Sequence, residues 1–228
     1  MIMMMAVALI PGMDIGGADF ASAATSTGTT TFYASQLAGS ETGIDITGDL
    51  ELIMDADLSI VYIKADGDIT ITSQDSTKHI LTLEDDDAQI KADSDENGAG
   101  DLVIDGIELS VYNLNRSSVY GKSVTIKNAT VSIKNLGINS LVYGQSVSIA
   151  NSDITLISYS DTDTPAIVGW KENVIIEDSK LTIENPVGYA DKRPSIGIST
   201  DGGAVLRNVT GIINSNLDSI HAGEVLLE

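Results

Sequence analysis

The stretch VTIKNATVSI, Val124–Ile133, recurs as VSIANSDITL from Val147, VIIEDSKLTI from Val174 and, less regularly, AVLRNVTGII from Ala204. The shared pattern is apolar-x-apolar-x-Asn/Asp-small-x-apolar-x-apolar, and the spacing between successive copies increases along the chain. Apolar residues alternate on both sides of the Asn or Asp, which is the period of a β-strand with one buried face. Each copy therefore predicts two short strands joined by a bend.

A third short apolar patch stands before each copy, as in SVYG, LVYG and AIVG. Three strands and three bends in about 21 to 30 residues match one coil of a parallel β-helix, which buries its inner face only when coils stack. We predict an all-β fold: a right-handed single-stranded parallel β-helix (β-solenoid) with three short strands per coil. Weaker copies are LVIDGIELSV from Leu102 and LTLEDDDAQI from Leu81, and VLLE begins another copy.

The bends carry a polar residue at one repeat position, namely Asn128, Asn151, Asp178 and Asn208. Asn and Asp tolerate the left-handed backbone conformation that a sharp bend requires, and their side chains can hydrogen-bond along a stack. We interpret this column as a structural ladder that holds the turn, and assign it no catalytic role.

The net charge of the chain argues against some classes of function. The chain has 228 residues, with 33 Asp and Glu against 12 Lys and Arg, and a formal net charge of −21. Such a surface repels nucleic-acid phosphates and attracts divalent cations, so we expect no nucleic-acid partner. The chain contains no cysteine, so it has no disulfide framework.

The N-terminus predicts export. MIMMMAVALI precedes Pro11 and has the length of a signal-peptide apolar region, and Ala21-x-Ala23 matches a cleavage pattern. We expect a truncated signal peptide at residues 1–23, a Ser/Thr-rich linker and N-terminal cap at 24–47, and the β-helix at 48–228 with a truncated C-terminus. The expected location is extracellular or at the cell surface, without membrane insertion of the mature form and as a monomer.

The acidic stretch KADSDENGAGD, residues 91–101, resembles the first half of a calcium loop. Asp93, Asp95 and Asn97 have the alternating spacing of the first ligands, and Asp101 falls at the ninth position. The twelfth position, normally a bidentate Glu, is Ile104. We expect acids one coil earlier, Asp85 and Asp87 among them, to complete the shell; the alternative is a solvated acidic loop.

An aromatic residue stands four positions before three of the repeat copies, at Tyr120, Tyr143 and Trp170. Equivalent positions of stacked coils lie about 4.8 Å apart, so we predict that the three side chains form a ladder. Flat aromatic surfaces suit the C–H faces of sugars, which makes the ladder a candidate carbohydrate platform. The alternative is stacking that stabilises the coil without any ligand.

The phrases YIKADGDITI (Tyr62–Ile71), SVYGKSVTIKNATVSIKN and SIHAGEVLLE (Ser219–Glu228) resemble extracellular right-handed β-helix proteins of Gram-positive, clostridia-like bacteria. The resemblance is to a family of calcium-associated carbohydrate-binding domains and covers roughly residues 48–228. It implies a secreted or surface-attached protein that binds a polysaccharide and holds calcium in its loops.

These observations favour a secreted or cell-surface, non-catalytic carbohydrate-binding (adhesive) module, with a polysaccharide or other glycan as partner. One alternative is a structural or adhesin stalk without a glycan ligand. Another is a pectin-type polysaccharide lyase, which needs calcium and a Lys or Arg base; Lys91 is the basic residue beside the acidic stretch. The sequence shows no lyase or hydrolase signature, which favours a non-enzymatic role.

Overall fold

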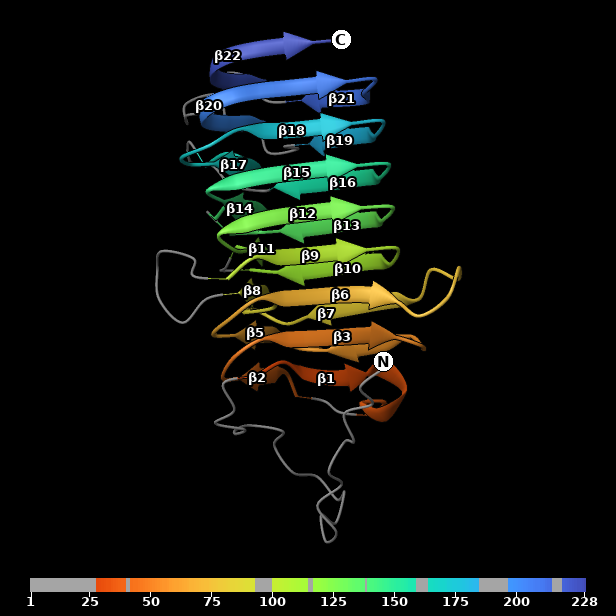
Figure 1. The fold of residues 1–228 in the computed structure, drawn as a ribbon. Helices are drawn as coiled ribbons and strands as arrows, with labels where there is room; N and C mark the ends of the chain where they lie inside the picture. Colours follow the sequence, from red (N-terminus) through yellow and green to blue (C-terminus); the bar gives the residue numbers. More distant parts are fainter. Residues whose placement is uncertain are drawn as a thin grey trace, which may run out of the picture.

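The computed structural model describes residues 28–39, 42–92, 100–114, 117–137, 139–158, 164–184, 197–214 and 219–228. The chain forms a right-handed parallel β-helix in which the coils rise along one axis from the N-terminal to the C-terminal end, as predicted (Figure 1). All strand pairs of the described residues are parallel, and each full coil after the first places one strand on each of three faces. The expected signal peptide lies outside the described residues.

The first face, in front in Figure 1, is made of seven strands and the C-terminal parts of two longer ones. They are β1 (Thr30–Tyr33), β3 (Leu50–Met54), β6 (Ile69–Ser73), β9 (Leu102–Asp105), β12 (Ser123–Lys127), β15 (Ser146–Ala150), β18 (Val174–Glu177), and the ends of β20 (Ile198–Arg207) and β22 (Ile220–Leu227).

The second face is a separate seven-stranded sheet with one strand per coil. It contains β4 (Leu58–Ile60), β7 (Ile80–Glu84), β10 (Glu108–Asn113), β13 (Thr130–Asn135), β16 (Asp153–Ser158), β19 (Lys180–Glu184) and β21 (Thr210–Asn214).

The third face consists of short strands and joins the first face through β20, which runs around the corner between them. Its members are β2 (Ile44–Ile46), β5 (Ile63–Ala65), β8 (Ile90–Ala92), β11 (Val119–Tyr120), β14 (Val142–Gly144), β17 (Ile167–Gly169) and the beginnings of β20 and β22. The first corner lies between the first and second faces, the second corner between the second and third, and the third corner between the third and first.

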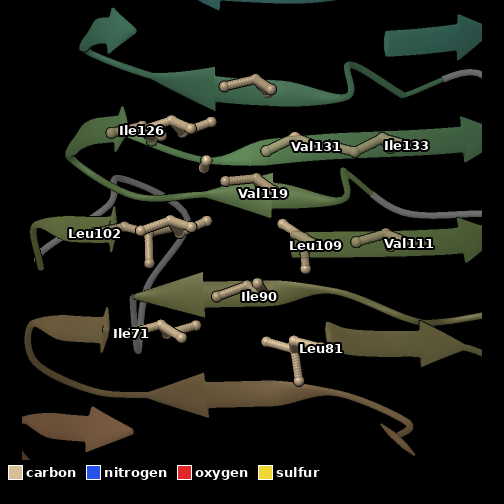
Figure 2. Close-up of a cluster of buried hydrophobic side chains, with 14 of the residues drawn as sticks. Ile71, Leu81, Ile90, Leu102, Leu109, Val111, Val119, Ile126, Val131 and Ile133 are labelled. Carbon is tan, nitrogen blue, oxygen red and sulfur yellow. The ribbon is translucent and has the colours of Figure 1, made fainter. Parts of the chain in front are cut away.

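The core lies inside the stack and is built by the alternation seen in the sequence. Ile71, Ile104, Ile126 and Ile149 pair from coil to coil, and each is fully buried. Figure 2 shows Ile71, Leu102 and Ile126 from the first face, with side chains of the other two faces pointing into the same interior. Aliphatic residues from three faces therefore fill one continuous core that a single coil could not bury.

The repeat register is confirmed for most copies. Val124 pairs with Val147, Val147 with Val174, Val174 with Ala204, and Leu102 with Val124. The prediction that a repeat copy begins at Leu81 is wrong. Leu81 belongs to the second face and pairs with Leu109, whereas the first-face partner of Leu102 is Ile69. The shift arises because a longer connection, Gln74–His79, replaces the short bend between β6 and β7.

Coil length varies more than the repeat predicts. The coil that begins at Leu50 is short and ends where Ile69 pairs with Leu50, whereas the next coil is much longer and ends where Leu102 pairs with Ile69. The corners absorb the difference, because the paired strands keep their inward alternation through both coils.

The polar bend column is confirmed. The φ angles of Asn128, Asn151, Asp178 and Asn208 are 53°, 50°, 47° and 48°, which is the left-handed region. Asn128 Nδ2 donates to Asp105 Oδ1 at 2.8 Å, and Asn208 Nδ2 donates to Asp178 Oδ1 at 2.8 Å. These residues hold the first corner in successive coils.

At the N-terminal end of the stack, residues from the range expected to be linker and cap add two further strands to the solenoid. β1 pairs with β3 and β2 pairs with β5, and between them the chain forms the 3-10 helix η1 (Ala34–Gln36). Ala34 and Leu37 are buried against the first coil. The described residues include no helix with the length and apolar character of a membrane span.

Candidate functional site

The third face displays a single file of outward side chains. The strands β5, β8, β11 and β14 each send one side chain outward, while the neighbouring residues enter the core. The register places Lys64, Lys91, Tyr120 and Tyr143 next to one another on four consecutive coils. We call this set the lysine–tyrosine column.

The two lysines of the column contact aromatic rings. Lys64 Nζ lies 4.2 Å from the centroid of the Tyr62 ring, and Lys91 Nζ lies 5.5 Å from that of Tyr120. Both distances are within the range of cation–π attraction, which holds each ammonium group against the face and limits its motion. All four residues of the column are partly exposed.

The predicted stacking of Tyr120 and Tyr143 is confirmed. Their ring centroids are 5.2 Å apart and the ring planes differ by 5°. One face of the Tyr120 ring is covered by Tyr143 and the other by Lys91. The second face of the Tyr143 ring is turned toward the next coil, where Val168 stands in register. Because valine is much shorter than tyrosine, the hydroxyl end of that ring face extends beyond it.

The prediction that Trp170 continues the ladder is wrong. Val168 pairs with Tyr143, and Trp170 follows Gly169 at the third corner, where its backbone N–H donates to the Gly144 carbonyl at 3.0 Å. Val147 is the third residue after Gly144, but Val174 is the fifth after Gly169, so counting back from Val174 misplaces the aromatic position by two. Trp170 is half-buried at that corner.

The phenol of Tyr143 keeps its proton at neutral pH. Partial burial against the solenoid raises its pKa above the ordinary value, because a phenolate there would lose hydration. Tyr143 therefore offers both a hydrogen-bond donor and the outer part of a ring face.

The predicted calcium residues divide into three groups. Asp93, Asp95 and Asn97 lie outside the described residues. Asp101 is exposed at the third corner, where its backbone N–H donates to Asp68 Oδ1 at 2.8 Å. Asp68 in turn donates its backbone N–H to Asp49 Oδ1 at 3.0 Å, so three coils share a column of aspartates that cap one another's backbone.

Asp85 and Asp87 lie at the second corner, before β8, and the structure does not bring them beside Asp101. They form a local turn in which the Asp87 N–H donates to Asp85 Oδ1 at 3.1 Å. The neighbouring coil instead places Asp68 next to Asp101. Within the described part of the chain, no group of three or more His, Cys, Asp or Glu side chains is arranged to hold a metal ion.

Sequence reasoning missed Lys64 and Lys91 as members of the aromatic column. The available signal was the repeated phrase IKAD, at Ile63–Asp66 and again at Ile90–Asp93. Both copies place a lysine between two inward apolar residues, which is the position that Tyr occupies in SVYG and LVYG.

No family model, curated protein or solved structure matches this chain. The resemblance to calcium-associated carbohydrate-binding domains therefore stays an expectation, and the column has to be interpreted from its own chemistry.

Proposed function

We propose that this protein is an exported, non-catalytic carbohydrate-binding module whose ligand lies along the third face. The supporting observation is the register of Lys64, Lys91, Tyr120 and Tyr143 on four consecutive coils. In a chain with a net charge of −21, this column groups two cations and two phenols that point outward together.

The column suits an extended ligand with many hydroxyl groups. Ammonium and phenol groups donate hydrogen bonds to sugar oxygens, and the outer part of the Tyr143 ring face can contact the C–H face of one sugar. Donors on adjacent coils repeat about every 4.8 Å, so a chain molecule running along the axis meets several of them at once. Binding on such a shallow face is the sum of weak contacts.

A structural stalk without a glycan ligand is the second candidate, and one observation favours it. Both faces of the Tyr120 ring are already covered, by Lys91 and Tyr143, so this residue stabilises the stack rather than offering a platform. Under this alternative, loss of Tyr143 lowers stability and changes no binding.

A glycan array with two matched variants separates the candidates. Tyr143→Ala removes the outer ring face and one donor, and we expect its signal to fall about tenfold on every glycan that the wild type binds. Tyr112→Ala is the control, because Tyr112 is an outward tyrosine of the second face whose ring contacts Lys134 at the same 5.5 Å distance as Lys91 and Tyr120. Equal signals from both variants, or no wild-type signal, would contradict the proposal.

We also propose, on the sequence pattern alone, that the loop containing Asp93, Asp95 and Asn97 binds calcium together with Asp101. Calcium should raise the melting temperature of the wild type, and EDTA should reverse the increase. The double variant Asp93→Asn, Asp95→Asn should lose this response, whereas Asp85→Asn, Asp87→Asn should keep it because those residues lie at another corner. If calcium leaves the melting temperature of the wild type unchanged, the proposed calcium site is excluded.

A further inference from the structure

The lysine–tyrosine column begins beside an aspartate with which its first lysine does not pair. Asp45 is the outward residue of β2 and stands in register with Lys64 on the next coil. Asp45 is exposed and Lys64 is partly exposed. Opposite charges on adjacent strands, about 4.8 Å apart, normally attract each other. These two side chains nevertheless form no ion pair, and neither has another ionic partner among the described residues.

Two other Asp–Lys pairs with the same register do form ion pairs. Asp105 and Lys127 are register partners on the first face, and Lys127 Nζ lies 3.2 Å from Asp105 Oδ2. Asp153 and Lys180 are register partners on the second face, and Lys180 Nζ lies 3.1 Å from Asp153 Oδ2. As in the third-face pair, the lysine stands one coil after the aspartate. This register is therefore sufficient for ion pairing, and another contact must keep the third-face pair apart.

The Tyr62 ring is that contact. Lys64 Nζ lies 4.2 Å from the ring centroid, which is within the range of cation–π attraction. The ring is itself fixed in place. The Tyr62 carbonyl accepts a hydrogen bond from the Ile44 N–H at 2.8 Å, and the ring lies directly on Gly43, where an added Cβ would be 2.5 Å from the ring Cγ. The missing side chain at Gly43 therefore makes room for the ring that binds the Lys64 ammonium group.

The result is a carboxylate and an ammonium group on adjacent coils that do not neutralise each other. The carboxylate of Asp45 only accepts hydrogen bonds, and the ammonium group of Lys64 only donates them. An anion would be attracted by Lys64 and repelled by Asp45, and a cation would experience the reverse. A neutral ligand that both donates and accepts suits the two groups together. Two neighbouring hydroxyl groups of a sugar do this, through hydrogen bonds that are strengthened by the charges.

We propose that Asp45 and Lys64 form a subsite for two neighbouring hydroxyl groups of one neutral sugar. Asp45 accepts a hydrogen bond from one hydroxyl, and Lys64 donates to the oxygen of the other. Tyr62 is a positioning residue that acts through Lys64. The inference rests on the proposed glycan binding along the third face and adds Asp45 and Tyr62 to that site. A site built to bond a hydroxyl rejects an analogue that lacks it, so this subsite selects among glycans.

A glycan array of neutral oligosaccharides tests the subsite. Asp45→Ala should lower the signal about tenfold on glycans that the wild type binds. Asp153→Ala is the control and should leave it unchanged, because it removes the aspartate of an Asp–Lys pair on the second face. Tyr62→Leu frees Lys64 to pair with Asp45 and should lower the signal as much as Asp45→Ala does, whereas Tyr62→Phe keeps the ring and should restore binding.

Deoxy forms of a bound glycan, each lacking one hydroxyl group, identify what the subsite contacts. Removal of one hydroxyl should lower the wild-type signal about tenfold, and Asp45→Ala should not distinguish that deoxy form from the parent glycan. The subsite alone is overturned if Tyr143→Ala lowers binding but Asp45→Ala lowers it no more than Asp153→Ala, or if each deoxy form loses equally in the wild type and Asp45→Ala. Equal signals from the two Tyr62 variants overturn the positioning role. No wild-type signal on any glycan overturns the proposed function and the subsite together.

Discussion

The first corner is turned differently in the later coils and in the early ones. From β9 onward one residue in the left-handed conformation makes the bend: Gly106 with φ 72°, then Asn128, Asn151, Asp178 and Asn208. The early corners, Asp55–Asp57 and Gln74–His79, contain no described residue with positive φ.

Different interactions hold the two kinds of corner. In the later coils the bend residue donates its own N–H to the next coil, as Asn128 does to the Ala150 carbonyl at 3.1 Å. In the early coils carboxylates accept hydrogen bonds from backbone N–H groups. Asp57 Oδ1 accepts from the Ile80 N–H at 2.9 Å, and Asp75 Oδ1 accepts from the Thr77 N–H at 2.7 Å. The later corners therefore depend on backbone conformation, and the early ones on hydrogen bonds to carboxylate side chains.

We expect core residues to contribute equally to stability in the early and the later coils. Substitutions in the core test this and give the largest expected loss of stability. Ile126→Ala in a later coil and Ile71→Ala in an early coil each remove a fully buried side chain from the same column, at a cost of about 2 to 5 kcal/mol. Urea unfolding should give values that agree within about 1 kcal/mol. A much smaller loss for Ile71→Ala would show that the early coils unfold as a separate unit.

A β-branched residue at the bend should destabilise a later corner more than an early one. Asn151→Val forces φ 50° on a side chain that disfavours it, and we expect a loss of about 2 kcal/mol, whereas Asn151→Gly should be nearly neutral. The matched early substitution, Ala56→Val, lies at a corner without positive φ and should cost about 0.5 kcal/mol or less. Thermal melting measures all three, and similar losses for the two valine variants would remove the distinction.

The smallest expected effect is a pH dependence of the stability that Asp55 contributes. The hydroxyl and N–H of Ser35 donate to the Asp55 carboxylate at 2.6 and 2.8 Å, and these bonds lower the pKa of Asp55. A carboxyl whose folded pKa is below its unfolded value adds stability above the unfolded pKa and loses it as pH falls through the folded pKa.

The melting temperatures of the wild type and Asp55→Asn should therefore differ more at about pH 7 than at about pH 3. Asn151→Gly is the control from the later coils, and its difference from the wild type should stay constant between the two conditions. A gap for Asp55→Asn that widens in acid would contradict the assignment of Ser35 as the partner.

Prediction from sequence succeeded where coil spacing was uninterrupted. The stack of Tyr120 on Tyr143 follows from the copies at Val124 and Val147, whose corners between Gly and Val have equal length. Prediction failed at Trp170 and at Leu81, because extra corner residues shift the register without changing the local pattern. Lys64 and Lys91 were missed because a lone lysine between apolar residues resembles any solvated strand position.

The sequence by itself determined that the chain is a stack of three-strand coils with left-handed bends at Asn128, Asn151, Asp178 and Asn208. Period-two alternation and an Asn or Asp at the bend are local properties, so each copy of the repeat shows them without its neighbours. Only the tertiary structure decided that Lys91 and Tyr143 cover the two faces of Tyr120, and that Val168 rather than Trp170 stands in register with Tyr143. Those facts depend on which residues of different coils become neighbours, and corner length sets that register independently of the strands.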